Sequence, residues 1–87
     1  MFIKEKIIKM ATITRQGNSV VIVNGEITNQ FPLNTIFAHI DKNSQSLDIK
    51  LRASRKTIMS LDYRDVTEPA STSAEDLLTK VTPLFYA

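Results

Sequence analysis

Few side chains in this 87-residue sequence could carry out catalysis or hold a metal, and they lie far apart. There is no cysteine, which excludes disulfides, thiolate zinc sites and cysteine nucleophiles. His39 is the only histidine, so a site built from several histidine ligands cannot form. We interpret His39 as a partly exposed or hydrogen-bonded strand residue, with a role as ligand or general base as the alternative. Gly17 and Gly25 both fall in turns, which leaves no glycine-rich phosphate loop.

Two carboxylates near an arginine are the other group with reactive potential. Asp62 and Asp65 flank Tyr63-Arg64, and paired carboxylates can do acid–base work. The simpler interpretation is that they cap turns and form a surface ion pair with Arg64. The hydroxyl residues 71–73 precede a helical pattern and predict capping rather than a nucleophile. We therefore predict a protein that is not an enzyme and that uses no cofactor, metal or small-molecule substrate.

A basic group is the most prominent polar feature, and it consists of Lys50, Arg52, Arg55 and Lys56. Lys50 and Arg52 share the outward face of a predicted strand, and the other two follow in its turn, so a hairpin would bring the four together. The group could contact nucleic-acid phosphates or an acidic partner protein, and a solvated face that protects a sheet edge is the alternative. Stacking aromatics should accompany single-strand binding, and the nearby Tyr63 is expected to point inward.

Composition limits the class of protein. The net charge is +2, from 11 basic and 9 acidic residues, which is too balanced for a dedicated electrostatic nucleic-acid binder. No apolar run approaches the ~20 residues that span a bilayer. A chain of this length forms one domain, and it buries only roughly 60–65% of its unfolded surface, so oligomerisation is a common source of added stability.

Alternating apolar residues predict a β-rich body. The predicted strands are 11–15, 19–23, 26–28, 35–40, 46–53 and 56–63. Asn24-Gly25 predicts a two-residue type I′ hairpin turn. The clearest alternation places four residues inward, namely Leu47, Ile49, Leu51 and Ala53. Residues 65–72 are expected to be a linker, because Pro69 excludes regular pairing.

A single helix is predicted at 73–82. Ser73 is a suitable N-cap and Asp76, three residues later, can complete a capping box. Pro83 disfavours helical geometry at Thr82 and so ends the helix. The predicted fold class is therefore α+β: a small antiparallel β-meander, or a partly open barrel, of five to six strands with one C-terminal helix. Residues 11–87 would form the domain and residues 1–10 an N-terminal arm.

The arm and several aromatic residues are candidates for contact with a partner. The arm is expected to be a terminal extension or an extra strand, with a membrane-surface contact as the alternative. It is too short for a signal peptide and lacks a cleavage site. A thin core cannot bury every apolar side chain, and terminal aromatics often anchor a neighbour. The predicted partner-binding residues are Phe2, Ile3, Phe31, Phe85 and Tyr86, with core packing as the alternative.

A resemblance appears in residues 46–82. A charged hairpin is followed by LDYRDVTEP at 61–69, a small polar stretch at 70–72, and SAEDLL at 73–78, which opens the helix. This layout resembles short β-rich proteins of tailed phages that infect Bacteroidota, including crAss-like phages. The resemblance implies a virion-associated or assembly role in many copies, and it carries over no catalytic residue. A second similarity, to pleckstrin-homology-like domains, concerns the fold alone, and the clear strands are too few for the full barrel.

These observations predict a non-enzymatic structural or protein-interaction component, a phage virion or assembly protein that acts in multiple copies. It would pair with itself or with larger virion proteins by strand addition, in the virion or the host cytoplasm. The alternative is a small nucleic-acid-binding module that uses the basic hairpin.

Overall fold

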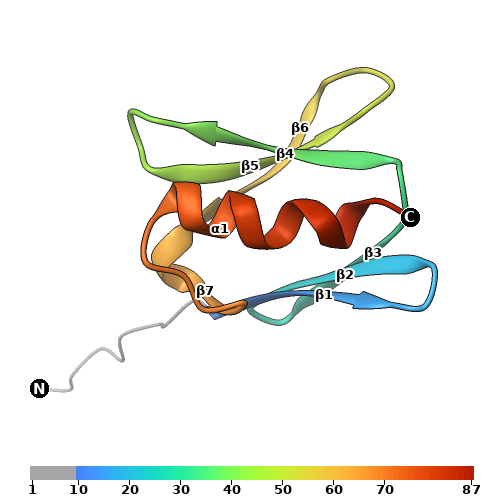
Figure 1. Cartoon of the computed structure of the whole chain (residues 1–87), viewed down its shortest axis with the longest axis horizontal. Helices are drawn as coiled ribbons and strands as arrows, with labels where there is room; N and C mark the ends of the chain where they lie inside the picture. The colour runs from blue at the N-terminus through green and yellow to red at the C-terminus, as the bar shows by residue number, and fades with distance from the viewer. Residues whose placement is uncertain (1–9) are drawn as a thin grey trace, which may run out of the picture.

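The computed structural model describes residues 10–87, and its strands form two sheets (Figure 1). The strands are β1 (Ala11–Gln16), β2 (Ser19–Asn24), β3 (Ile27–Pro32), β4 (Ile36–Asp41), β5 (Ser46–Leu51), β6 (Thr57–Asp62) and β7 (Val66–Glu68). One sheet has the order β3-β2-β1-β7 and the other β4-β5-β6. Helix α1 (Ala74–Val81) lies between them, and two 3₁₀ helices follow β6 and α1, namely η1 (Tyr63–Asp65) and η2 (Thr82–Phe85). The predicted α+β class, β-rich with one C-terminal helix, is confirmed, and the sheets do not close into a barrel.

The first two hairpins turn on glycine. Gln16 pairs with Ser19 and Asn24 with Ile27, so the loops are the dipeptides 17–18 and 25–26. Only the glycine of each loop has a positive φ, at 62° and 65°, which is the pattern of a type II′ turn. The predicted type I′ turn on Asn24-Gly25 is therefore wrong by one residue. Asn24 stays in the ladder, since a type II′ turn needs a positive φ at its first central position only, and Gly25 supplies it at least cost.

The two hairpins of the second sheet have loops of four residues, 42–45, and five residues, 52–56. Each loop contains a left-handed residue at or next to its end, Gln45 with φ 55° and Arg55 with φ 61°. In the second loop the N–H of Arg55 donates to the carbonyl of Leu51 at 2.8 Å. The prediction that Ala53 faces inward is wrong, because β5 ends at Leu51 and Ala53 lies exposed in this loop.

Helix α1 begins where its cap residue predicts. The N–H of Asp76 donates to the Ser73 hydroxyl at 3.0 Å. The Asp76 carboxylate accepts the N–H of Thr72, at 3.0 Å, rather than that of the N-cap residue itself. The α-helix ends at Val81, but Thr82 keeps helical φ and ψ of −52° and −47°. The expected effect of Pro83 on Thr82 is therefore wrong, since Pro83 fits the first turn of η2, where its missing N–H is not needed.

One hydrophobic core joins both sheets to the helix. Leu77, Val81 and Phe85 recur every four residues and are fully buried. The core cluster consists of Ala11, Ile13, Val20, Ile22, Ile36, Leu47, Ile49, Leu61, Val66, Leu77, Val81 and Phe85. Among the helices of residues 10–87, none is both long and apolar enough to cross a membrane.

Strand β7 was expected to be part of a linker, and that prediction is wrong. β7 pairs in parallel with β1, with Val66 opposite Ala11, and Val66 is buried. The Thr67 hydroxyl donates to the Ala11 carbonyl at 3.3 Å, across 56 residues of sequence. Pro69 ends the strand but does not prevent it. Residues 10–87 thus form seven strands instead of five or six, and one of these strand pairs is parallel.

Candidate functional site

The predicted basic group gathers at one end of the β4-β5-β6 sheet. Lys50 lies half-buried near the end of β5, and Arg52, Arg55 and Lys56 are exposed in and beside the loop that follows. The loop is closed by the N–H of Leu51, which donates to the carbonyl of Lys56 at 3.0 Å. In Figure 1 this β5–β6 hairpin projects away from α1. The hairpin therefore places the four basic residues in or next to one loop, and the grouping of their side chains stays a prediction.

An aromatic side chain that the sequence reasoning missed completes the group. Phe37 on β4 lies directly opposite Lys50 on β5. Phe37, Arg52 and Arg55 line an open pocket of about 270 Å³. We call the surface formed by Phe37, Lys50, Arg52, Arg55 and Lys56 the basic corner. The sequence predicts only that Phe37 lies on the outward face of its strand. That Lys50 lies opposite it follows from the β4–β5 register, which the sequence does not give.

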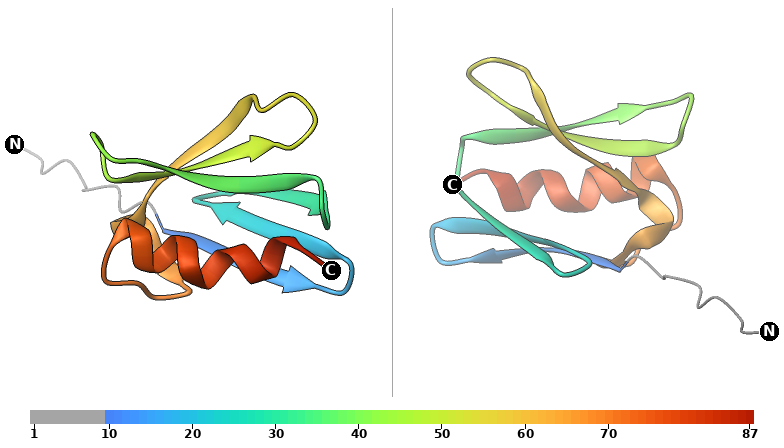
Figure 2. Two further views of the ribbon diagram at one scale, coloured as in Figure 1. Left: turned by 45° about the horizontal axis from the view of Figure 1, so that its top comes forward. Right: turned by 180° about the vertical axis from the view of Figure 1, so that it is seen from behind.

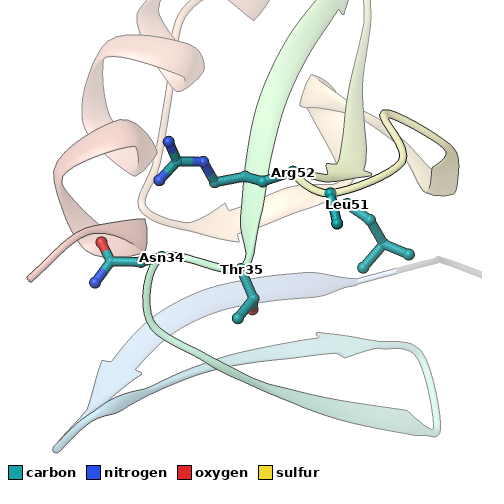
Figure 3. Close-up of a pocket in the computed structure, with 5 residues that line it drawn as sticks. Asn34, Thr35, Leu51 and Arg52 are labelled. Atoms are coloured by element: carbon teal, nitrogen blue, oxygen red, sulfur yellow. The ribbon is translucent and has the colours of Figure 1, made fainter.

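Arg52 is held in position by the end of the chain. Its guanidinium carbon lies 5.4 Å from the centre of the Tyr86 ring, which is the geometry of a cation–π contact. The backbone N–H of Arg52 donates to the Thr35 carbonyl at 2.9 Å. Figure 3 shows Arg52 and Asn34 projecting toward the C-terminal end. Asn34 fixes that end, since its N–H donates to the carbonyl of Phe85 at 2.8 Å and its side-chain oxygen accepts the N–H of Ala87 at 3.3 Å. A second pocket, of about 500 Å³, is lined by Asn34, Thr35, Leu51, Arg52 and Ala53.

The positive charges of the basic corner are not neutralised by carboxylates of the described residues. The ion pairs found in residues 10–87 are Arg64–Asp62 at 2.7 Å and Lys80–Asp76 at 3.0 Å, and both lie elsewhere. None of the four basic residues of the corner therefore has a described carboxylate within 4.0 Å. The corner is a concentration of positive charge in a chain whose net charge is only +2.

Of the two carboxylates near Arg64, Asp62 forms the expected surface ion pair, and no ion pair between Asp65 and Arg64 is found within residues 10–87. Arg64 donates from Nε to Asp62 Oδ1 at 3.0 Å and from Nη2 to Oδ2 at 2.7 Å. These bonds, with the bond from the Arg64 N–H, lower the pKa of Asp62 to about 2. Asp62 thus stays ionised at neutral pH, which does not suit a general acid or base. His39 lies exposed opposite Asp48, and no three metal-ligating side chains gather within residues 10–87.

The predicted partner-binding residues have very different environments. Phe85, the last residue of η2, is 0% exposed and belongs to the core. Its assignment as a partner contact is therefore wrong. Phe31 and Tyr86 are half-buried and pack against the core. Phe2 and Ile3 lie outside the described residues. The exposed large apolar side chains of the described part were all missed, namely Met10 at 55%, Ile27 at 63% and Ile58 at 37%.

Ile27 and Ile58 belong to strands that end their sheets. Among the strands of residues 10–87, β3 has a neighbour on the β2 side alone and β6 on the β5 side alone. Figure 2 shows both strands on the face of the molecule away from α1. The alternation of residues in the sequence predicts the face of β3 on which Ile27 lies. It does not predict that no core residue covers this side chain.

Comparison with known proteins gives no relative: no family model, curated protein or solved structure matches the chain.

Proposed function

We propose that this protein is a non-enzymatic interaction component that acts in multiple copies and assembles by strand addition along β3. A neighbouring copy is the proposed partner, with a larger protein of the same assembly as the second one. The proposed setting, a phage virion or its assembly in the host cytoplasm, rests on the sequence resemblance in residues 46–82.

The outer edge of β3, which pairs with no other strand of residues 10–87, is the observation that supports this proposal. In the antiparallel β2–β3 ladder, hydrogen-bonded pairs alternate with non-bonded ones. The N–H of Leu33 donates to the Asn18 carbonyl at 3.1 Å, which extends the ladder and fixes its phase. The backbone N–H and carbonyl groups of Ile27, Asn29 and Phe31 therefore point toward β2. The N–H and carbonyl groups of Thr28 and Gln30 point away from the sheet, where an added strand would bind them.

The side chains of β3 do little to discourage such pairing. Its sequence, ITNQFP, contains no charged residue, although charges are a common protection of free edges. Pro32 closes only the end of the strand. Ile27, the most exposed large apolar side chain of the described residues, lies at the other end, where an added strand would cover it.

Light scattering across a concentration series tests the proposal. The wild-type mass should be a multiple of the protomer mass of 9.8 kDa, or should rise toward one with concentration. Gln30→Pro should give the protomer, because it removes a donor from the free edge without removing a bond to β2. Gln30→Ser is the matched control and should assemble normally. A wild-type protein that stays a protomer at high micromolar concentration overturns self-assembly, and an assembled Gln30→Pro variant overturns the role of β3.

The virion setting has its own test. Purified particles made from the genome that encodes this chain should contain it in multiple copies, which quantitative mass spectrometry measures. Its absence from both particles and assembly intermediates would reject the setting but not the strand pairing.

A further inference from the structure

We propose that the basic corner binds single-stranded nucleic acid, with a base stacked on Phe37 and the adjoining phosphates on Lys50, Arg52 and Arg55. The inference goes beyond the proposed function. The basic corner lies on the β4-β5-β6 sheet, whereas the proposed assembly uses β3 of the other sheet. A protein that never self-assembles could therefore still bind nucleic acid at the corner.

The environment of Phe37 is the first argument. The inward residues of β4 are Ile36, Ala38 and Ile40, which belong to the core or pack against it. Phe37 lies on the other face of β4, is half-buried, and is not among the residues that pack against the core. An aromatic ring beside a pocket, without a core to fill, offers a stacking surface. Because every base has an aromatic face, such a ring binds bases of any sequence.

The charges around this ring are the second argument. Lys50 is directly across the ladder from Phe37, and Arg52 and Arg55 line the same pocket. Arg52 is already oriented by the Tyr86 ring, so it loses less conformational freedom on binding. Guanidinium groups bind phosphate oxygens through two hydrogen bonds at once. The pocket therefore joins an apolar platform to cations that no described carboxylate neutralises.

The combination favours a single strand over the other anionic partners. A duplex stacks its bases on one another and offers no free base face to Phe37. Acidic side chains of a protein would pair with the cations but would offer no aromatic face to stack on Phe37. The position of Phe37 is thus the feature that selects single-stranded nucleic acid.

Fluorescence anisotropy with a labelled oligothymidine of about ten nucleotides, within the usual site sizes for single strands, measures the binding. Three to four phosphate contacts should give a slope of log K against log salt of about −2 to −3. Absence of binding at low salt overturns the proposal. Equal affinity for a duplex of the same length also overturns it, as does equally strong competition by polyglutamate, which would assign the corner to an acidic protein.

Variants separate the ring from the charges. Phe37→Leu should weaken binding about tenfold and leave the salt slope unchanged, whereas Phe37→Tyr should bind normally. Arg52→Gln should reduce the slope by about 0.7. Lys42→Gln, which removes the same charge at the opposite end of the sheet in the β4–β5 loop, is the control and should leave the slope unchanged. Circular dichroism should show that all four variants fold. Normal binding by Phe37→Leu, or an equal effect of Lys42→Gln, would contradict the proposed site.

Discussion

Two adjacent aromatic residues near the C-terminus have opposite environments. Phe85 is fully enclosed by the core, while Tyr86 is half-buried against Arg52 at the surface. Both are aromatic and lie near the C-terminus, as partner anchors often do. Phe85 is the last residue of η2 and Tyr86 follows it, so the two side chains point in different directions. Identity alone could not distinguish them, because the direction depends on how η2 leaves the helix.

The burial of Phe85 gives the first stability prediction. Phe85→Ala should lower the free energy of unfolding by about 3–5 kcal/mol, because it removes apolar contacts and leaves a cavity. Urea denaturation measures the loss. Tyr86→Ala should cost less, since Tyr86 is only half-buried and packs at the border of the core. An unchanged urea midpoint together with lost self-association would instead identify Phe85 as a surface anchor.

The Asp62–Arg64 ion pair predicts an acid-dependent stability. The folded pKa of Asp62, about 2, lies below the ordinary 3.8, so the pair stabilises the fold above that ordinary value and its contribution is lost as the pH falls toward 2. Both side chains reach solvent, with exposures of 70% for Arg64 and 30% for Asp62, so screening by solvent keeps the contribution of this ion pair small.

Asp62→Asn should therefore be less stable than the wild type near pH 6, and the difference should shrink as the pH falls from 3.8 toward 2, as measured by urea unfolding at each pH. Glu26→Gln removes a carboxylate that makes no described ion pair, and its difference from the wild type should not follow this course. A difference between Asp62→Asn and the wild type that stays constant across this pH range would show that the ion pair contributes nothing.

At the scale of elements, α1 depends on its first turn. The helix has only eight residues, so it is too short to be stable without its cap and its packing. Ser73→Ala should cost about 1 kcal/mol of unfolding free energy, because it removes the acceptor for the Asp76 N–H. Thr79→Ala is the control: Thr79 is exposed, bonds only the Glu75 carbonyl, and should be neutral or slightly stabilising as alanine. Equal losses in the two variants would argue against the cap.

The elements that local chemistry determines were predictable from the sequence. Glycine marks the first two turns and Ser73 marks the start of α1, because each acts on residues within four positions of itself. β7 has no such signal, since its partner Ala11 lies far away in the sequence. The basic corner shows the same division. Its cations could be grouped from their spacing, but Phe37 joins them only through the β4–β5 register, which depends on a four-residue loop.

At the scale of the whole molecule, the two proposed surfaces lie on different sheets. The β3 edge belongs to β3-β2-β1-β7 and the basic corner to β4-β5-β6, and one core joins them. Each protomer can therefore offer its corner while its β3 edge is occupied. An assembly along β3 would then present several corners, and a long strand could contact more than one of them.

This arrangement predicts that assembly raises affinity only for long strands. Linked binding sites gain about 10²–10⁴-fold when one ligand spans them, and nothing when it reaches a single site. Gln30→Pro should therefore bind a ten-nucleotide oligothymidine as tightly as the wild type does, yet bind one several times longer far more weakly, as competition anisotropy would measure. Gln30→Ser should match the wild type with both lengths. If Gln30→Pro also weakens the short oligonucleotide, then the edge and the corner are not independent, because a change confined to the β3 edge would have altered a site on the other sheet.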